Sequence, residues 1–113
     1  MHEMSIALSV IDAVTTRALQ EGGGRVTEIE LAIGSLAGVQ LESLRFCFSA
    51  ASRGTLAEHA EIVIHERHAE AQCVDCSSRF AIGSYLARCP VCAGYRFTVV
   101  SGEEFSIQSI TIE

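Results

Sequence analysis

The 113-residue sequence lacks several features that mark common classes of protein. It has no tryptophan, and aromatic residues make up only 6%, so aliphatic side chains must fill the core. It has neither a long apolar run nor a basic, apolar leader, which argues against a membrane-spanning or secreted chain. Repeats and low-complexity segments are absent apart from one glycine triplet. We therefore expect a cytoplasmic, reduced protein with one core and at most a small appendage.

The charge balance narrows the choice of partner. Fourteen acidic side chains against eight basic ones give a formal net charge of −6. An acidic domain repels phosphate backbones, so we expect neither a nucleic-acid partner nor a membrane partner. The sequence also has no nucleophile elbow, P-loop or glycine-rich dinucleotide loop. These absences favour a binding protein over an enzyme, with a metal cation or a basic protein patch as its partner.

Hydrophobic periodicity predicts two helices and three strands. Apolar residues recur every three or four positions over residues 3–20 and 40–52, as in amphipathic helices. Gly22–Gly24 then ends the first helix, because glycine adopts the left-handed cap conformation without penalty. Strands are predicted over residues 25–33, 61–65 and 104–112. The alternation of the first strand slips at Thr27–Glu28, which leaves its register open.

Four of the five cysteines form two CxxC units, Cys73 with Cys76 and Cys89 with Cys92, twelve residues apart. Each pair brings two thiolates to one ion, and together they complete the tetrahedral shell that Zn²⁺ prefers. A full shell has no open position for substrate, so the predicted zinc is structural. A redox pair and an iron–sulfur cluster are the alternatives. The odd cysteine count argues against a disulfide scaffold.

Other residues near the cysteines are assigned simpler roles. His65 and His68 precede the first pair, but a complete four-thiolate shell leaves no place for them, so we expect surface histidines. His59 is expected at the surface too. Cys47 lies between two phenylalanines in a predicted helix and is expected to be a buried core thiol. Gly94 follows the second pair and is expected to supply a positive φ in that turn.

The amino terminus carries a second candidate metal site. The simplest interpretation of Met1-His2-Glu3 is a disordered start. However, the Met1 amine, the His2 amide nitrogen and the His2 imidazole can form two fused chelate rings in one plane. Planar nitrogen donors suit Ni²⁺ or Cu²⁺. Glu3 could supply a fourth donor through its amide or its carboxylate.

Several motifs together resemble the HypA/HybF family, the nickel metallochaperones of [NiFe]-hydrogenase maturation. The resemblance covers the whole chain in order. The motifs are MHEMS at the start, RVT at 25–27 followed by IG at 33–34, FCF at 46–48, RGT at 53–55, and CxxC with CPxC. The resemblance implies an α+β fold in which two helices lie on a three-stranded sheet. This nickel-binding domain would comprise residues 1–66 plus 102–113, and a zinc-ribbon-like module at 67–101 would be inserted into it.

The resemblance also implies ligands and partners. Ni²⁺ would be transient cargo, bound by the His2 imidazole and nearby backbone nitrogens with Glu3 assisting, while Zn²⁺ would be structural. A nickel-handling GTPase and the hydrogenase large-subunit precursor would be the partners, and the resemblance is compatible with a homodimer. Many relatives carry an acidic residue at the position of Gln40. Gln40 cannot supply a carboxylate, and Glu42 is a candidate substitute.

Two other functions compete with nickel delivery. A zinc-ribbon adaptor or nucleic-acid-binding module would use the four-cysteine module as its working face and would need no nickel. The acidity of the chain and its lack of interleaved basic and aromatic residues argue against that function. A metal-dependent hydrolase is the third alternative, and the closed zinc shell argues against it.

Overall fold

The computed structural model describes residues 2–113, which divide into two compact units. The first unit holds Met1–Leu31, Val39–His65 and Ser106–Glu113. The second holds Ala32–Gly38 and Glu66–Phe105. The chain therefore passes from one unit to the other four times. None of the described helices has the length and apolar character needed to cross a bilayer.

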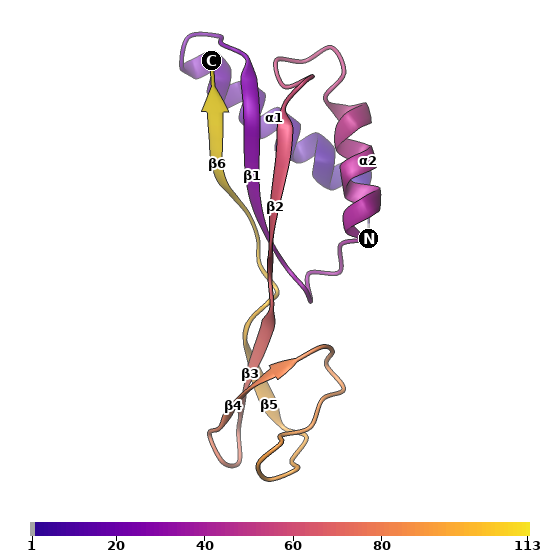
Figure 1. Cartoon of the computed structure of the whole chain (residues 1–113), viewed down its shortest axis with the longest axis vertical. Helices are drawn as coiled ribbons and strands as arrows, with labels where there is room; N and C mark the ends of the chain where they lie inside the picture. Colours follow the sequence, from indigo (N-terminus) through magenta and orange to yellow (C-terminus); the bar gives the residue numbers. More distant parts are fainter. Residues whose placement is uncertain (1) are drawn as a thin grey trace. The chain divides into compact units, whose positions relative to one another are not determined.

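The first unit contains both helices and a three-stranded sheet, which confirms the predicted fold class. The helices are α1 (Glu3–Gln20) and α2 (Leu41–Ala51), and the strand order is β2 (Glu61–Arg67), β1 (Val26–Gly34), β6 (Phe105–Ile112). Both helices lie on the same face of the sheet (Figure 1).

Backbone hydrogen bonds define the directions of these strands. The Val26 amide donates to the Leu56 carbonyl ahead of β2, and the Ser35 amide donates to the Arg67 carbonyl at its end. The starts and the ends of β1 and β2 thus lie together, so these strands run parallel and α2 is their crossover. Strand β6 runs antiparallel to β1 (Figure 1).

The core of the first unit explains the slip seen in the sequence. Val26 and Ile29 are both buried although they are three residues apart, so the alternation of β1 is broken at Thr27–Glu28. Ala32, on the opposite face of the strand and at the start of the second unit, is buried as well. From α1, the residues that pack beneath the sheet recur at helical spacing. They are Ala7, Val10, Ile11, Val14 and Ala18.

The second unit is a small antiparallel sheet in the order β4-β3-β5. Its strands are β3 (Ala69–Cys73), β4 (Arg79–Ile82) and β5 (Phe97–Ser101). The hydrophobic cluster at its centre is small: Ala69, Ala71 and Ile82 are buried, with half-buried hydrophobic residues packed around them. So small a core contributes little burial energy, which makes the unit a candidate for stabilisation by a metal.

The end of β1 and the loop after it belong to the second unit, although the boundaries expected from the sequence put them in the first. The reason is hydrogen bonding to distant segments. Ser35 donates to Arg67 over 2.9 Å, and Leu36 donates to Gly102 over 2.7 Å. The Leu36 side chain also packs against the small core of this unit. That residues 67–101 form a separate zinc module stays a prediction.

Two glycines allow the backbones to approach closely in this region. A Cβ placed on Gly34 would lie 2.0 Å from the Gly102 carbonyl oxygen. A Cβ on Gly102 would lie 2.5 Å from Cα of Ala69. Gly102 also has a φ of +107°, which side chains rarely tolerate. Both positions therefore require glycine.

Candidate metal centre

The side chains of Cys73, Cys76, Cys89 and Cys92 converge on one point at the end of the second unit. Their four Sγ atoms all lie within 4.8 Å of one another. Cys73 and Cys92 are 3.6 Å apart at sulfur, and Cys76 and Cys89 are 3.5 Å apart. A tetrahedral zinc with bonds of about 2.3 Å places its sulfurs roughly 3.8 Å apart. The donor set and its spacing therefore fit a tetrahedral metal ion.

The two CxxC loops have the same backbone hydrogen-bond pattern. In the first loop, the Ser77 amide donates to the Cys73 carbonyl and the Cys73 amide donates to the Ser78 carbonyl. In the second loop, the Ala93 amide donates to the Cys89 carbonyl, and the Cys89 amide donates to the Gly94 carbonyl. Each cysteine pair is thus presented by a closed turn. The sequence repeat CxxC corresponds to a structural repeat.

Both turns place a non-glycine residue at positive φ, directly after the second cysteine. Ser77 has a φ of 64° and Ala93 a φ of 62°. The expectation that Gly94 supplies the positive φ is wrong, because the turn requires a positive φ one residue earlier, at Ala93. Gly94 has a different role: a Cβ there would lie 3.0 Å from the Asp75 carboxylate and 3.3 Å from the Cys92 sulfur. Its lack of a side chain leaves room for both groups.

Polar neighbours bias how the thiols ionise. Hydrogen bonding with the hydroxyl and the backbone of Ser78 lowers the pKa of Cys76 to about 6. At Cys92, the Gly94 backbone lowers the pKa, but hydrogen bonding to Cys73 and burial outweigh that effect and raise it to about 12. The sulfurs therefore hold their protons unequally. A metal ion that binds them must displace the protons that remain.

Arginines near the cluster are engaged by other groups. Arg96 forms an ion pair with Asp75, which lies between the first two cysteines. Arg88 stacks over the Tyr95 ring at 4.6 Å and approaches the Ala93 carbonyl. The contact between Arg96 and Asp75 was not predicted from the sequence. A carboxylate inside one CxxC unit and an arginine just after the other were the available signal.

At the amino terminus, α1 begins at Glu3, directly after the exposed His2. The first helical hydrogen bond runs from the Ile6 amide to the His2 carbonyl at 3.2 Å. The amides of residues 2–5 therefore precede the ladder and are not used by it. Met1 lies outside the described residues, so its proposed amine ligand cannot be placed.

The Glu3 carboxylate is held by the start of α2. Its Oε2 accepts a hydrogen bond from the Gln40 backbone amide at 3.1 Å, and this bond lowers the pKa of Glu3. The Gln40 side chain caps α2 instead, accepting from the Ser43 amide at 2.7 Å. Gln40 thus contributes to this site through its backbone, which no carboxylate-based motif could reveal. Glu42 lies in the first turn of α2.

The remaining candidate residues lie elsewhere. His65 is exposed and pairs with Glu30 at 3.0 Å, and His59 and His68 are exposed. Among residues 2–113, the four cysteines are the only cluster of three or more potential ligands that could hold an ion. Cys47 is half-buried rather than fully buried, so its predicted place in the core is wrong.

Comparisons with known proteins agree with these features. Residues 1–112 match the family described as "HypA: Hydrogenase/urease nickel incorporation, metallochaperone, hypA". Curated relatives named "Hydrogenase maturation factor HypA" include those of Chlorobaculum parvum, 58% identical, and Chlorobaculum tepidum, 51% identical. Each of these alignments covers all of this chain and all of the relative. The Geotalea daltonii relative is 42% identical over 99% of both chains.

Solved structures share the fold. The solution structure of the Ni metallochaperone HypA from Helicobacter pylori superposes with a TM-score of 0.68 at 21% identity, covering 99% of this chain and 97% of that one. A second solution structure, of a HypA protein, gives a TM-score of 0.72 at 21% identity over 100% and 97%. At this identity the likeness supports the fold alone.

Proposed function

We propose, because this chain belongs to the HypA family of nickel metallochaperones, that it binds Ni²⁺ at its amino terminus and delivers it for hydrogenase maturation. Members of this family are maturation factors rather than enzymes. The proposed ligands are the His2 imidazole, the His2 amide nitrogen and the Met1 amine, with Glu3 assisting. The observation that carries the proposal is the exposed His2 next to the fixed Glu3 carboxylate.

The position of this site at a helix terminus suits a carrier that must release its cargo. The positive end of the α1 dipole disfavours a cation by about 0.3–1 kcal/mol. The Glu3 carboxylate opposes that effect, and the unused amides of the first turn provide nitrogen ligands. Planar nitrogen coordination selects Ni²⁺ or Cu²⁺ over Mg²⁺ or Ca²⁺. The site is therefore selective by ligand type without being a closed cage.

We further propose that Cys73, Cys76, Cys89 and Cys92 bind a structural Zn²⁺. The sulfur spacing and the two matching turns support this assignment. Four thiolates leave no position for exchange with a substrate, so the bound ion would stabilise the second unit rather than travel. A zinc site made of four thiolates requires reduced cysteines, which the proposed cytoplasmic location would maintain.

A nickel titration tests the amino-terminal site. Zinc-loaded, tag-free protein and a His2→Ala variant are titrated with Ni²⁺ and followed by calorimetry and by absorption of planar nickel. His59→Ala is the matched control, since it also removes an exposed histidine from the first unit. Loss of saturable binding in His2→Ala alone is the expected result. Equal binding by all three proteins would overturn the proposal.

The composition allows a second, independent test. The chain has no lysine, so an amine-specific acylating reagent can modify only the Met1 amine. If that amine is a ligand, Ni²⁺ slows acylation of the intact protein, and acylated protein no longer binds nickel. His2→Ala should be acylated at the same rate with and without nickel. Unchanged nickel affinity after complete acylation would remove the amine from the ligand set.

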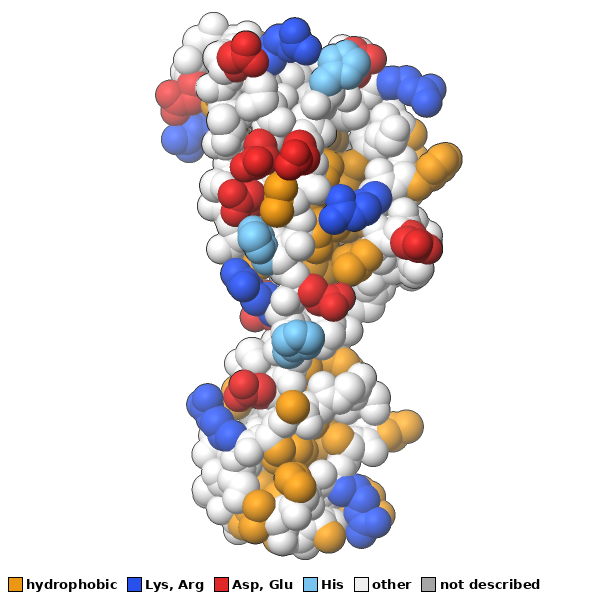
Figure 2. Space-filling model, viewed as in Figure 1, with side chains coloured by type: hydrophobic (Ala, Val, Ile, Leu, Met, Phe, Trp, Pro, Cys, Tyr) orange, Lys and Arg blue, Asp and Glu red, His pale blue; other side chains and the backbone are white. Residues whose placement is uncertain are grey.

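The proposed partners are a nickel-handling maturation GTPase and the hydrogenase large-subunit precursor. Membership of a maturation family supports contact with that machinery. The second unit offers area for such contacts, because hydrophobic side chains gather on the face seen in Figure 2. Among the exposed ones, Leu86 is 91% accessible and Val91 is 70% accessible. Contiguous exposed apolar patches are typical of surfaces that bind another protein.

A further inference from the structure

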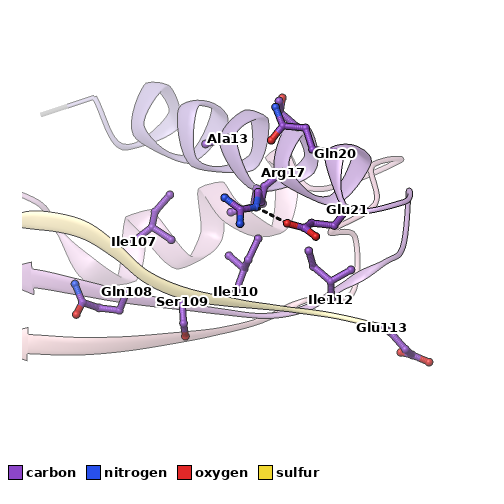
Figure 3. A pocket seen from close by; sticks show the side chains of 12 residues that line it. Ala13, Arg17, Gln20, Glu21, Ile107, Gln108, Ser109, Ile110, Ile112 and Glu113 are labelled. Carbon is purple, nitrogen blue, oxygen red and sulfur yellow. Dashed lines mark hydrogen bonds and ion pairs between the residues drawn. The ribbon is translucent and has the colours of Figure 1, made fainter.

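A groove of about 980 Å³ in the first unit lies away from the proposed nickel site. It runs between the second half of α1 and β6 (Figure 3). Its first lining residue on the helix is Ala13, ten residues after Glu3, which is about 15 Å along a helix. The walls of this groove therefore cannot fix ligands at the amino terminus. With the exposed His2 beside it, Glu3 must be fixed by individual hydrogen bonds.

Gln40 uses its polar groups to join the starts of the two helices. Its carbonyl accepts a hydrogen bond from the Leu44 amide at 2.9 Å. Its side-chain oxygen caps the same helix by accepting from the Ser43 amide at 2.7 Å. Its own amide donates to Oε2 of Glu3 at 3.1 Å. Both oxygens of Gln40 are thus engaged within α2, and its backbone N–H is the group that reaches the start of α1.

This hydrogen bond determines how the Glu3 carboxylate can bind a metal ion. A carboxylate held through Oε2 offers only Oε1, so it binds through a single oxygen. The proposed nitrogen ligands of Met1 and His2 occupy three corners of a planar ion, which leaves one corner for such an oxygen. A carboxylate that used both oxygens would instead suit the larger, oxygen-rich shell of Ca²⁺.

We propose that Gln40 is a positioning residue of the nickel site and that it acts through its backbone N–H. By holding Oε2 of Glu3, it presents Oε1 as the fourth ligand. A side chain that is held before the ion arrives loses less freedom on binding, which favours affinity. This inference rests on the nickel site proposed above. The Gln40 side chain has no part in it, so the absence of a carboxylate at this position does not weaken nickel binding.

Replacing Gln40 by proline removes the N–H. The φ of Gln40 is −86°, close to the range of proline, so the start of α2 can be retained. Proline also removes the side-chain cap, and Gln40→Ala is therefore the matched control, because it loses the cap but keeps the N–H. In calorimetry, Gln40→Pro should bind Ni²⁺ about two- to tenfold more weakly, since its Glu3 side chain must be ordered at each binding event. Gln40→Ala should bind like the wild type.

A double-mutant cycle separates positioning from a change in the fold. Glu3→Ala removes the group that the N–H holds, so Gln40→Pro should cause no further loss of nickel affinity in that variant. An equal loss with and without Glu3 would overturn the proposal, and so would wild-type affinity in Gln40→Pro. His2→Ala tests the nickel site itself. If only His2→Ala loses nickel, the site stands and the positioning role fails.

Amide hydrogen exchange provides a measurement that does not depend on the folding of the proline variant. Exchange at Gln40 is followed by NMR in the wild type, in Glu3→Ala and in nickel-loaded protein. It should be slow in the wild type, faster in Glu3→Ala, and still slow once Ni²⁺ is bound. Equal exchange in the wild type and Glu3→Ala would overturn the proposal. Faster exchange on nickel binding would overturn it too, because the ion would then displace Gln40 from Glu3.

Discussion

Replacing Gly102 by alanine tests the packing of the second unit most directly. Gly102 has a φ of +107°, and a residue with a Cβ in such a region costs about 1–3 kcal/mol. The new Cβ would also lie 2.5 Å from Cα of Ala69. Ala69 is buried and paired with Ile82 in the sheet, so it cannot move without loss of pairing. Such overpacking costs about 1–3 kcal/mol more. The two effects together predict a loss of roughly 2–6 kcal/mol.

Other glycines separate these two contributions. Gly34→Ala keeps an ordinary φ but puts its Cβ 2.0 Å from the Gly102 carbonyl oxygen, so it isolates the steric cost. Gly23→Ala has a φ of +83° with nothing within 4 Å, so it isolates the backbone cost of about 1–2 kcal/mol in the first unit. Gly83→Ala has neither problem, and should be neutral or stabilising by about 0.4–1 kcal/mol.

The composition supplies a separate probe for each unit. Both tyrosines, Tyr85 and Tyr95, lie in the second unit, and both helices lie in the first. Urea unfolding followed by tyrosine fluorescence therefore reports the second unit, whereas circular dichroism at the helical wavelength reports the first. Gly102→Ala should lower the urea midpoint seen by fluorescence, whereas Gly83→Ala should leave it unchanged or raise it. Equal midpoints for these two variants would refute the close-packing argument.

Three further predictions concern the metal centres and use the same assays. Removing zinc with a chelator should abolish the ordered tyrosine signal while leaving most helical circular dichroism, because the buried core of the second unit is so small; simultaneous loss of both signals would contradict this. Ala93→Gly should stabilise the zinc-loaded second unit by about 1 kcal/mol, since glycine accepts the positive φ of 62° without strain. A lower urea midpoint for this variant would show that Ala93 is not strained. Glu3→Gln keeps an acceptor for the Gln40 amide but removes the charge, so nickel affinity should fall while the thermal midpoint stays constant; unchanged affinity in calorimetry would exclude the carboxylate from the site.

Local patterns were sufficient to predict the first unit. The helix expected over residues 3–20 is α1, because its apolar residues keep helical spacing and Gly22–Gly24 follows it. The strands of the larger sheet were predicted for the same reason, within a few residues of their observed ends. The slip at Thr27–Glu28 was visible in the sequence too. Only its consequence, burial of both Val26 and Ile29, needed the structure.

Features that depend on distant contacts could not be predicted. The strands around the cysteines are only four or five residues long, and the alternation in β3 (AEAQC) rests on two alanines and a cysteine, which is too weak a signal to predict a strand. The loop after β1 joins the second unit through backbone hydrogen bonds of Ser35 and Leu36. A residue with any side chain could make these bonds, so the sequence does not reveal them. Gln40 was judged by its side chain, yet its amide is the group that meets Glu3. The four cysteines were the exception, because metal-ligand spacing is encoded locally.

The pairing of β3 with β5 affects how the rest of the chain folds. It joins Glu70 to Ser101, so the chain leaves the second unit close to the point where it entered. About 37 residues separate the end of β2 from the start of β6, and closing an open loop of that length costs roughly 3 kcal/mol of chain entropy. Once the second unit has folded, that cost no longer opposes the pairing of β6 with β1. Because β6 follows the second unit along the chain, an ion that stabilises the second unit would also control when the sheet of the first unit can be completed.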